Sequence, residues 1–327
     1  MNIYDIAKEA GVSISTVSRV LNNKSNVMPA TREKVQAVLD KHSYTPNAIA
    51  RGLVARSMKT VAVLTVDVRV PHYARTTYII ERAFSKLNYH VLVCNTGGEL
   101  EEARRYARLL AERQVDGIVL VGSIFNKLGQ DEEVAACLHN IPVVSANGQP
   151  GLPNGYSVLV DDVQGIELAV EHLAQKGRQN IVYVKDLDTD SAQLKQQGFY
   201  TAMQKRGVKN AKNRVIKAEY GLAGGEEAAA QIVALRPDAV VCAEDLTAVG
   251  VMKGIINAGL KVPEDIAVIG YNNSEYSVIC TPELTTVDNK VEMSALFSVQ
   301  LLESLIEKDE SFSSMSIQPE LVVRQSS

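Results

Sequence analysis

The sequence predicts a small α-helical N-terminal domain followed by an α/β core of two doubly wound parallel-sheet lobes. Two patterns carry this prediction. Near the N-terminus, apolar residues recur at helical spacing in three short segments. From residue 59 onward, short runs that are apolar throughout alternate with amphipathic segments, which is typical of parallel strands covered by helices on both faces. A chain of 327 residues is long enough for two or three folded units of this kind.

The first two predicted helices are joined by a tight turn. Asn2 can cap a helix that starts at Ile3, and Gly11 can end it, because glycine adopts the left-handed conformation without strain. Ser13 can cap the second helix, which is expected over residues 14–21, and a third helix is expected over 31–42. The pair is either a plain helical hairpin or a helix-turn-helix that reads DNA.

The outward face of the second helix favours the DNA-reading interpretation. It carries short hydroxyl side chains and one arginine, with no acidic residue between positions 13 and 22. A helix that enters the major groove needs short hydrogen-bonding side chains and an arginine that can reach a guanine edge or a phosphate. The outward residues are Ile14, Ser15, Thr16, Ser18 and Arg19.

Charge is distributed unevenly along the chain. Residues 1–58 hold eight Lys and Arg against four Asp and Glu, a net charge of +4, whereas the whole chain has a net charge of −4. The remaining residues therefore carry −8. A basic end on an acidic body indicates one anionic partner that docks at that end.

Residues 43–57 lie between the helical domain and the core. Pro46 suits the first position of a helix, but the segment spans only about two turns and contains Gly52, so it is too short to be a stable helix in isolation. It is either an interdomain linker or a hinge that becomes helical against a second copy of the chain and DNA. In the second case Leu53, with Arg51 beside it, would be an apolar wedge in the minor groove.

The core alternates strands and helices in two series, and the break between them is predicted near residues 155–158. Strands are expected at 61–66, 90–95, 116–122 and 142–147, and again at 157–162, 180–186, 214–219, 238–244 and 266–272. Helices are expected at 73–88, 99–114 and 129–140, then at 163–176, 190–206, 223–234 and 246–258, and finally at 291–307 before a strand near 315–323. Two such lobes would form a cleft, and ligands bind beyond the carboxyl ends of the strands in open α/β sheets. Those ends carry Asn95, Ser123, Asn147, Asp186, Glu244 and Asn272.

The sequence lacks the motifs of several enzyme classes. No GxGxxG follows the first strand, the glycines of GIVLVGS at 117–123 lack the lysine of a phosphate loop, and neither GxSxG nor HExxH occurs. The pair Gly224–Gly225 is predicted to be a turn. The four cysteines have no metal-ligand spacing and are expected to be reduced thiols of a cytoplasmic protein, and no apolar run is long enough to span a bilayer. We therefore expect no enzyme activity, no metal and no cofactor.

Several segments of the sequence closely resemble motifs of the LacI (lactose repressor) family of bacterial transcription regulators. The resemblance covers nearly the whole chain. It is carried by IYDIAKEAGVSISTVSRVLN, YTPNAIARGL, VDGIVLVGS, VDDVQGIELAVEHL, and VPEDIAVIGYNN followed by PELTTVDN. The resemblance implies a repressor that binds pseudo-palindromic operator DNA as a homodimer. It also implies gating by a small molecule bound between two periplasmic-binding-protein-like lobes. Because the sequence ends without a leucine heptad tail, a dimer is expected rather than a tetramer.

The resemblance also implies domain boundaries and DNA contacts. The domains would be a helix-turn-helix headpiece at 1–45, a hinge at 46–58, an N-terminal lobe at 59–157 with 291–318, and a C-terminal lobe at 158–290 with 319–327. The chain would then cross between the lobes three times. In the headpiece, Ile14, Ser15 and Arg19 would approach base edges, and Leu53 in the hinge would insert at the central step and kink the DNA. The other expected DNA-binding residues are Ser13, Thr16, Ser18 and Asn22 at phosphates, and Asn47 and Arg51 in the hinge.

Eight cleft positions correspond to the family's effector-binding positions. At three of them this sequence has a residue that differs from the family's usual one. The family usually has an arginine where Lys195 stands, an aspartate at Asn272, and an asparagine or aspartate at Glu244. An ammonium cannot form the bidentate contact of a guanidinium, so the grip on sugar hydroxyls must differ. The expected ligand is a sugar or sugar-like metabolite, with a modified or acidic sugar, a nucleobase-like compound, or a protein partner instead of a ligand as alternatives. The expected effector-binding residues are His72, Tyr73, Asn147, Lys195, Tyr220, Glu244, Asn272 and Asn289.

Two other functions fit parts of the sequence. The lobes alone would fit a solute-binding protein of a transporter, but the amphipathic, capped N-terminus does not look like a signal peptide and the basic headpiece argues against it. A sugar-active enzyme would also fit the lobes, but no catalytic constellation is present.

Overall fold

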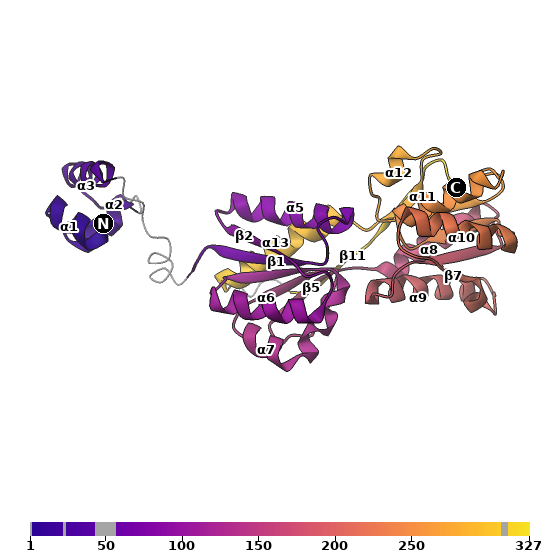
Figure 1. The fold of residues 1–327 in the computed structure, drawn as a ribbon, viewed down its shortest axis with the longest axis horizontal. Helices are drawn as coiled ribbons and strands as arrows, with labels where there is room; N and C mark the ends of the chain where they lie inside the picture. Colours follow the sequence, from indigo (N-terminus) through magenta and orange to yellow (C-terminus); the bar gives the residue numbers. More distant parts are fainter. Residues whose placement is uncertain (1, 22–23, 43–56, 309–312) are drawn as a thin grey trace. The chain divides into compact units, whose positions relative to one another are not determined.

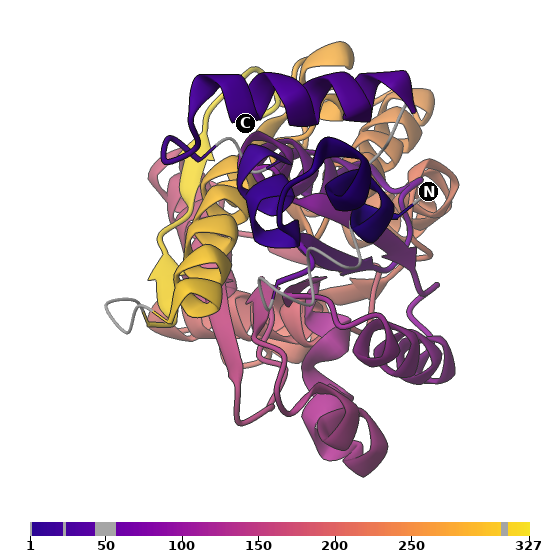
Figure 2. The ribbon, with the colours of Figure 1, turned by 90° about the vertical axis from the view of Figure 1, so that its left-hand side faces the viewer.

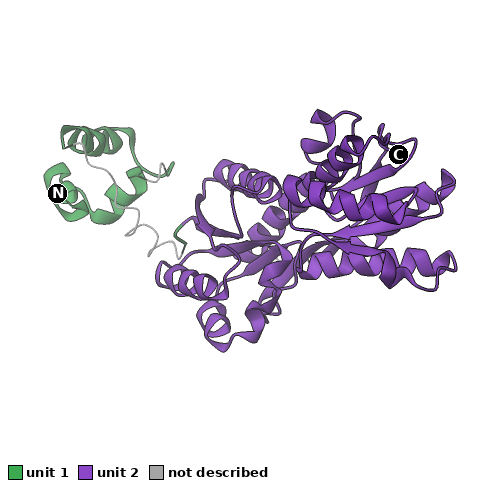
Figure 3. Ribbon diagram, turned by 45° about the vertical axis from the view of Figure 1, so that its right-hand side comes forward, with its two compact units in different colours: residues 1–58 green, residues 59–327 purple. Residues whose placement is uncertain are grey.

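The computed structural model describes residues 2–21, 24–42, 57–308 and 313–327. The chain forms two compact units, residues 1–58 and residues 59–327, which are coloured separately in Figure 3. The predicted roles of Asn22, Asn47, Arg51 and Leu53 lie outside the described residues, as does most of the predicted hinge.

The described residues of the first unit form three helices, which Figures 1 and 2 show in indigo. Asn2 caps the first helix: its Oδ1 accepts hydrogen bonds from the Tyr4 and Asp5 amides, and the Asp5 carboxylate accepts one from the Asn2 amide in return. Gly11 ends this helix with φ at 66°. The three helices are α1 (Ile3–Ala10), α2 (Ile14–Leu21) and α3 (Pro29–Lys41).

A small apolar core holds these helices together. It contains two buried residues from each helix, Ile6, Ala7, Val17, Val20, Val35 and Leu39. The side chain of Glu9 adds polar contacts between α1 and the end of α3, because its carboxylate lies 2.8 Å from Lys41 Nζ and 2.8 Å from His42 Nε2. The headpiece is therefore fixed by few residues, and each of them matters for its stability.

The second unit begins with a six-stranded sheet, which we call the first lobe together with the helices on its faces (Figure 1). Five strands follow the order β5-β4-β3-β1-β2, all pairs being parallel, and β11 from near the end of the chain adds to β5. The strands are β1 (Thr60–Thr65), β2 (His90–Asn95), β3 (Gly117–Val121), β4 (Val143–Ala146), β5 (Gly155–Val160) and β11 (Met315–Ile317).

Helices cover both faces of this sheet, as the continuous apolar strands predict. One face packs on α5 (Pro71–Lys86) and α13 (Val291–Glu307). The other packs on α6 (Leu100–Glu112), α7 (Glu132–Leu138) and the 3-10 helix η1 (Ser123–Gln130).

The second lobe repeats the arrangement with a sheet in the order β12-β10-β9-β8-β6-β7, in which only the β10–β12 pair is antiparallel. Its helices α8 (Asp162–Gln175) and α9 (Asp190–Lys205) cover one face, and α10 (Leu222–Leu235) and α11 (Asp245–Asn257) cover the other. Two short helices, η2 (Ala211–Arg214) and α12 (Tyr276–Ile279), lie in its connections. The strands are β6 (Ile181–Lys185), β7 (Val215–Lys217), β8 (Ala239–Cys242), β9 (Ala267–Tyr271), β10 (Thr285–Asp288) and β12 (Glu320–Val322).

The described chain passes between the two sheets three times: after β5, between β10 and α13, and between β11 and β12. This corrects two sequence-based expectations. The predicted break at residues 157/158 falls inside β5, which pairs with β4 and β11 along its length and so belongs wholly to the first sheet. The single strand expected near 315–323 is two strands in different sheets, because an apolar pattern does not say which sheet a strand joins.

The glycines at the start of α10 are helical, so the prediction of a turn at Gly224–Gly225 is wrong. Both are buried: Gly224 lies against the backbone of Glu219, and Gly225 lies where α10 crosses α11. A Cβ atom on Gly225 would overlap the Thr247 carbonyl oxygen, and one on Gly250 would overlap the Leu222 carbonyl oxygen. These glycines allow the two helix backbones to approach closely.

Within the part of the chain that the structure describes, no helix is long and apolar enough to cross a membrane. The same residues contain no group of three or more His, Cys, Asp or Glu side chains arranged to hold a metal ion. All four cysteines are free thiols.

Candidate functional site

The outer face of α2 presents the side chains that the sequence predicts to contact DNA. Val17 and Val20 are buried against α1 and α3, which turns the opposite side of α2 outward. Ser13, Ile14, Ser15 and Arg19 are exposed, whereas Thr16 and Ser18 are half-buried.

The hydroxyl groups at the start of α2 form a cluster. Ser13 Oγ lies 2.8 Å from Ser15 Oγ and 2.9 Å from Thr16 Oγ1, and it accepts a hydrogen bond from the Thr16 amide. These contacts position the donors and acceptors at the N-terminal end of the helix. No acidic residue lies in α2, so nothing on this helix repels a phosphate backbone.

The second unit contains two adjacent cavities between its lobes. The inner cavity, with a volume of about 40 Å³, lies beyond the carboxyl ends of the strands of both sheets. The outer cavity, of about 560 Å³, shares His72, Glu244 and Asn272 with it and opens toward α5, Tyr220 and Tyr276. A volume of this size is typical of a site for a small molecule.

The predicted effector-binding residues come together here. Seven of the eight line the inner cavity: His72, Tyr73, Asn147, Lys195, Glu244, Asn272 and Asn289. Tyr220 lines the outer cavity. The site prediction omitted four polar residues that also line the inner cavity, Ser123, Asp186, Thr189 and Ser191. The sequence placed Ser123 and Asp186 among the residues at the strand ends, where ligands bind in open α/β sheets, but did not include them among the effector-binding residues.

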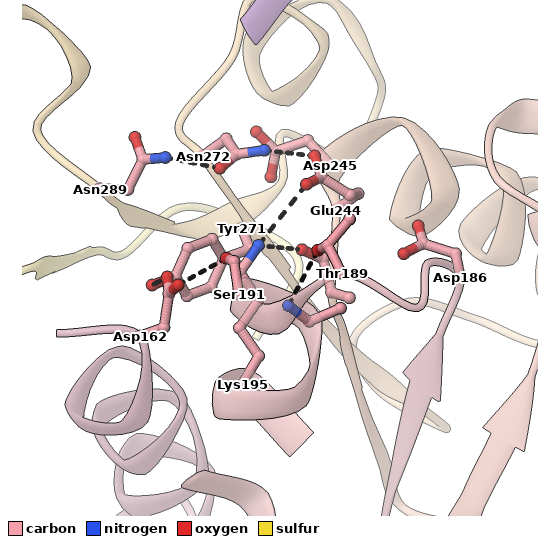
Figure 4. A network of polar contacts seen from close by, with 12 residues as sticks. Asp162, Asp186, Thr189, Ser191, Lys195, Glu244, Asp245, Tyr271, Asn272 and Asn289 are labelled. Carbon is pink, nitrogen blue, oxygen red and sulfur yellow. Dashed lines mark hydrogen bonds and ion pairs between the residues drawn. The ribbon is translucent and has the colours of Figure 1, made fainter. Parts of the chain in front are cut away.

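Lys195 lies at the centre of the polar network in Figure 4. It projects from α9, and its Nζ donates a hydrogen bond to the Ala243 carbonyl oxygen at 3.0 Å. The same Nζ lies 3.5 Å from Glu244 Oε1 and 3.9 Å from the centre of the Tyr271 ring. The ammonium group is therefore held by three partners of the second lobe, which offsets the cost of its burial.

A chain of side-chain amides extends from Glu244 to the crossover before α13 (Figure 4). Asn289 Nδ2 donates to Asn272 Oδ1 at 2.7 Å, and Asn272 Nδ2 donates to Glu244 Oε2. Asn272 has φ at 104°, in the left-handed half of conformational space where residues other than glycine are uncommon. Strained backbone at such a point is characteristic of functional sites.

The floor of the site is a second hydrogen-bonded group. Asp162 accepts hydrogen bonds from Tyr271 OH at 2.7 Å and from Ser191 Oγ at 2.5 Å. This group orients Tyr271, whose ring in turn contacts Lys195.

Three polar atoms that line the cavity are buried without a hydrogen-bond partner among the described residues. They are His72 Nδ1, Asp186 Oδ1 and Asn289 Oδ1. Because buried polar groups are nearly always paired, such a group of unpaired atoms around one cavity indicates that something else supplies the partners.

Burial shifts several ionisable groups at the site. It raises the pKa of Glu244 to about 8, although Lys195 acts in the opposite direction. It lowers the pKa of His72 to about 4, so the imidazole is neutral at pH 7. It also raises the pKa of Asp186 and raises that of Tyr73 to about 12.

Two hydrogen bonds join the lobes at one edge of the inner cavity. Asn126 Nδ2 in η1 donates to Asp190 Oδ2 at the start of α9 at 2.7 Å, and the Ser191 amide donates to Ser123 Oγ at 3.1 Å. The Gln149 amide donates to the Asn126 Oδ1 atom and fixes the orientation of that side chain. We refer to these contacts as the interlobe latch.

A three-helix headpiece with an exposed hydroxyl-rich helix, together with a two-lobed core around a polar cleft, defines a ligand-binding regulator of the helix-turn-helix class. The family model described as "Bacterial regulatory proteins, lacI family" matches residues 2–47, and that of the "Periplasmic binding protein-like domain" matches residues 170–327. The chain belongs to the LacI family and is a DNA-binding transcription regulator, as its sequence predicts.

Relatives and solved structures agree with this assignment. An HTH-type transcriptional regulator of Lachnoclostridium phytofermentans is 35% identical over 99% of this chain and 98% of its own, and the repressor PurR of Aliivibrio fischeri is 31% identical over 99% and 97%. The lac repressor dimer bound to operator and an anti-inducer has a TM-score of 0.87 at 26% identity, covering 100% of this chain and 98% of its own. A LacI-family regulator of Lactobacillus casei with bound sucrose has a TM-score of 0.72 at 26% identity over 82% and 99%. These matches confirm the predicted fold class.

Proposed function

We propose that the protein is a homodimeric repressor of transcription whose affinity for a pseudo-palindromic operator is set by a small molecule in the interlobe cleft. The observation that carries this proposal is the combination of the exposed α2 face with a cavity, in a separate unit, that is lined by polar atoms without a hydrogen-bond partner among the described residues. The lac repressor dimer, a structural neighbour, binds operator, and the PurR relative is a repressor.

On this proposal the headpiece, residues 1–45, supplies the DNA contacts and residues 46–58 form the hinge. Ile14, Ser15 and Arg19 contact base edges, because they are exposed on one face of α2. Ser13, Thr16 and Ser18 contact phosphates. Asn22, Asn47, Arg51 and Leu53 complete the DNA-binding set, with Leu53 as the minor-groove wedge.

Membership of the two sheets supports the following proposed boundaries of the lobes. The N-terminal lobe comprises residues from 59 to the end of β5 together with 291–318, and the C-terminal lobe comprises the residues after β5 up to 290 together with 319–327. Several structural neighbours hold sugars, among them cellobiose and sucrose. A ligand of the same general class would place its ring in the outer cavity against Tyr220 and its polar groups in the inner cavity.

The interlobe latch suggests how a ligand could control DNA affinity. Hydrogen bonds between the lobes favour one lobe arrangement, and a ligand that contacts residues of both lobes changes the free energy of that arrangement relative to an open one. A change in lobe arrangement alters the spacing of the two headpieces of a dimer, which in turn changes the affinity for two half-sites.

The proposal is tested by selecting retained sequences from randomised duplex DNA with the purified full-length protein at a fixed salt concentration. The expected result is an enriched pseudo-palindrome bound by two copies of the chain. Retention of all sequences alike, or a single half-site bound by one copy, would contradict it. The selected duplex then serves as the probe for the experiments below.

A further inference from the structure

The inner cavity contains more carboxylates than cations. Asp186 and Glu244 line it, burial raises the pKa of both carboxyl groups, and the charge of Asp186 raises that of Glu244 further. The cations and neutral base that face these groups are Lys195 and His72, and His72 is neutral at pH 7. One ammonium therefore faces two carboxyl groups, of which that of Glu244 is largely protonated at pH 7 until a second cation enters.

The ammonium of Lys195 is already committed to partners within the second lobe. It donates to the Ala243 carbonyl oxygen and lies over the Tyr271 ring, with Glu244 at 3.5 Å. Its side chain is 6% exposed, so little of it is available to a ligand. An anionic ligand group in the inner cavity would meet two acidic side chains and an ammonium that already has partners.

Asp186 provides the second, independent observation. The residue is 8% exposed, and one oxygen, Oδ2, accepts a hydrogen bond from Thr247 Oγ1 at 2.5 Å. Among the described residues, the other oxygen, Oδ1, has no hydrogen-bond partner. Figure 4 shows the carboxylate at the margin of the network and outside its dashed contacts. A buried carboxylate oxygen without a donor requires a donor from elsewhere, and a charged donor satisfies it best.

The aromatic residues at the site also favour a cation. Tyr73 lines the inner cavity and Tyr220 the outer one, and burial, with Glu244 as the second cause, raises the pKa of both phenols, so both rings stay neutral. Aromatic faces attract a positive charge that is partly removed from water. The inner volume of about 40 Å³ admits a few water-sized groups, so it fits an ammonium but excludes a sugar ring.

We propose that the effector carries a protonated primary amine, as in an amino sugar, and that the ammonium group occupies the inner cavity between Asp186 and Glu244. This inference rests on the proposed role of the cleft as the effector site. The ring occupies the outer cavity, where Arg75 and Tyr220 lie, and the amine distinguishes the effector from neutral and acidic sugars.

The test compares matched sugars on the full-length protein by titration calorimetry. The probes are glucosamine, glucose, N-acetylglucosamine and glucuronate, together with the same four derivatives of the galactose and mannose series. In at least one series the amine is expected to bind about tenfold or more tightly than the neutral, acetylated and acidic forms. Tightest binding of a neutral or acidic form, or binding of none of the three amines at 10 mM, overturns the inference.

Variants of the two acidic residues test whether the ammonium group of the ligand lies between them. Asp186→Asn and Glu244→Gln keep the side-chain shape and are each expected to reduce affinity for the amine about tenfold or more while the weak binding of the neutral sugar is unchanged. Glu226→Gln is the matched control, because Glu226 lies in the same lobe but pairs with Lys253 outside the cavity. Equal losses for the amine and the neutral sugar would assign the two carboxylates to folding and overturn the inference.

A second readout needs only the wild-type protein. Because Glu244 is largely protonated at pH 7, an ammonium placed beside it should release a substantial fraction of a proton. Calorimetry in two buffers of different ionisation enthalpy measures that release, and its absence for a bound amine overturns the inference. The same preparation is assayed on the selected operator. If the protein binds the operator but binds none of the amino sugars, only this inference is rejected. If the protein does not bind the operator, the proposed function is rejected.

Discussion

Asn126 and Asp190 join the two lobes through a hydrogen bond of 2.7 Å from an amide Nδ2 to a carboxylate oxygen. The donor belongs to η1 of the first lobe and the acceptor to the first turn of α9 in the second. The next residue, Ser191, repeats the connection through its backbone amide. The lobes are thus linked beside the cavity that their strand ends enclose.

Removal of the Asn126 side chain should weaken the interlobe latch. For Asn126→Ala we expect hydrogen exchange at the Ser191 amide to become about threefold to tenfold faster, because a hydrogen bond to a charged group is lost and the lobes open more often. Mass spectrometry of the peptide that contains Ser191 measures this. The matched control is Asn257→Ala, whose amide donates to Glu226 within the second lobe. Equal exchange in wild type and Asn126→Ala would show that the latch does not hold the lobes.

Arg19 should determine which DNA sequence is bound. Arg19→Ala is expected to weaken binding to the selected operator by about 1–3 kcal/mol if the guanidinium contacts a guanine edge, and to affect unrelated DNA less. Fluorescence anisotropy at one salt concentration measures both affinities. Lys34→Ala, an exposed charge on α3, is the control for the loss of one positive charge. A loss for Arg19→Ala that is equal on every DNA sequence would assign this side chain to a phosphate.

Ile6 should limit the stability of the headpiece alone. It is fully buried in the six-residue core, and its replacement by alanine should cost about 2–5 kcal/mol. Because the two units are separate, differential scanning calorimetry of Ile6→Ala should show an early transition for the headpiece and an unchanged one for residues 59–327. Operator binding should be lost at the temperature of the early transition. A shift of both transitions together would mean that the units unfold as one.

Glu244 should make the second unit less stable at alkaline pH. Its pKa is about 8 in the folded protein against an ordinary value of 4.5, so between these values the folded state holds a proton that the unfolded chain has released. The stability that this carboxyl contributes therefore decreases as the pH rises from about 5 through 8, by about 1.4 kcal/mol for each pH unit between the two pKa values.

Urea unfolding of wild type and Glu244→Gln at pH 6 and pH 9 measures this effect. The wild type should lose more stability between the two pH values than the variant does, since glutamine does not titrate. Asp186 and Asp245 also have raised pKa values and are present in both proteins, so the difference between the two proteins reports Glu244 together with its charge interaction with these neighbours. The same pH dependence in both proteins would place the titration elsewhere.

Periodicity alone predicted most of the helices and strands because both sheets are buried on both faces and their strands are apolar throughout. It did not predict β10, whose four residues, Thr285–Asp288, include two threonines and an aspartate. That segment is a strand because β9 and β12 pair with it on either side. Gly225 was likewise misinterpreted as part of a turn, since only the approach of α11 shows why glycine is needed there.

The cleft residues that follow the strands were predictable from position, whereas their chemistry was not. The sequence shows that Lys195 and Glu244 are a lysine and a glutamate, but the Ala243 carbonyl oxygen and the Tyr271 ring that occupy the ammonium are tertiary contacts. The unpaired oxygen of Asp186 and the link from Asn126 to Asp190 also depend on how the lobes meet. No spacing along the chain encodes such contacts.

The claim that the arrangement of the lobes controls DNA binding is tested most directly by cross-linking the two lobes and measuring operator affinity. Asn126→Cys and Asp190→Cys are introduced into a chain whose partly exposed Cys137 and Cys280 are serine, and a short bis-maleimide joins the two new thiols. We predict that affinity for the selected operator changes by about fivefold or more on cross-linking, in either direction, while the two single-cysteine proteins treated alike are unchanged. Identical operator affinity before and after cross-linking would contradict the claim that the arrangement of the lobes controls DNA binding.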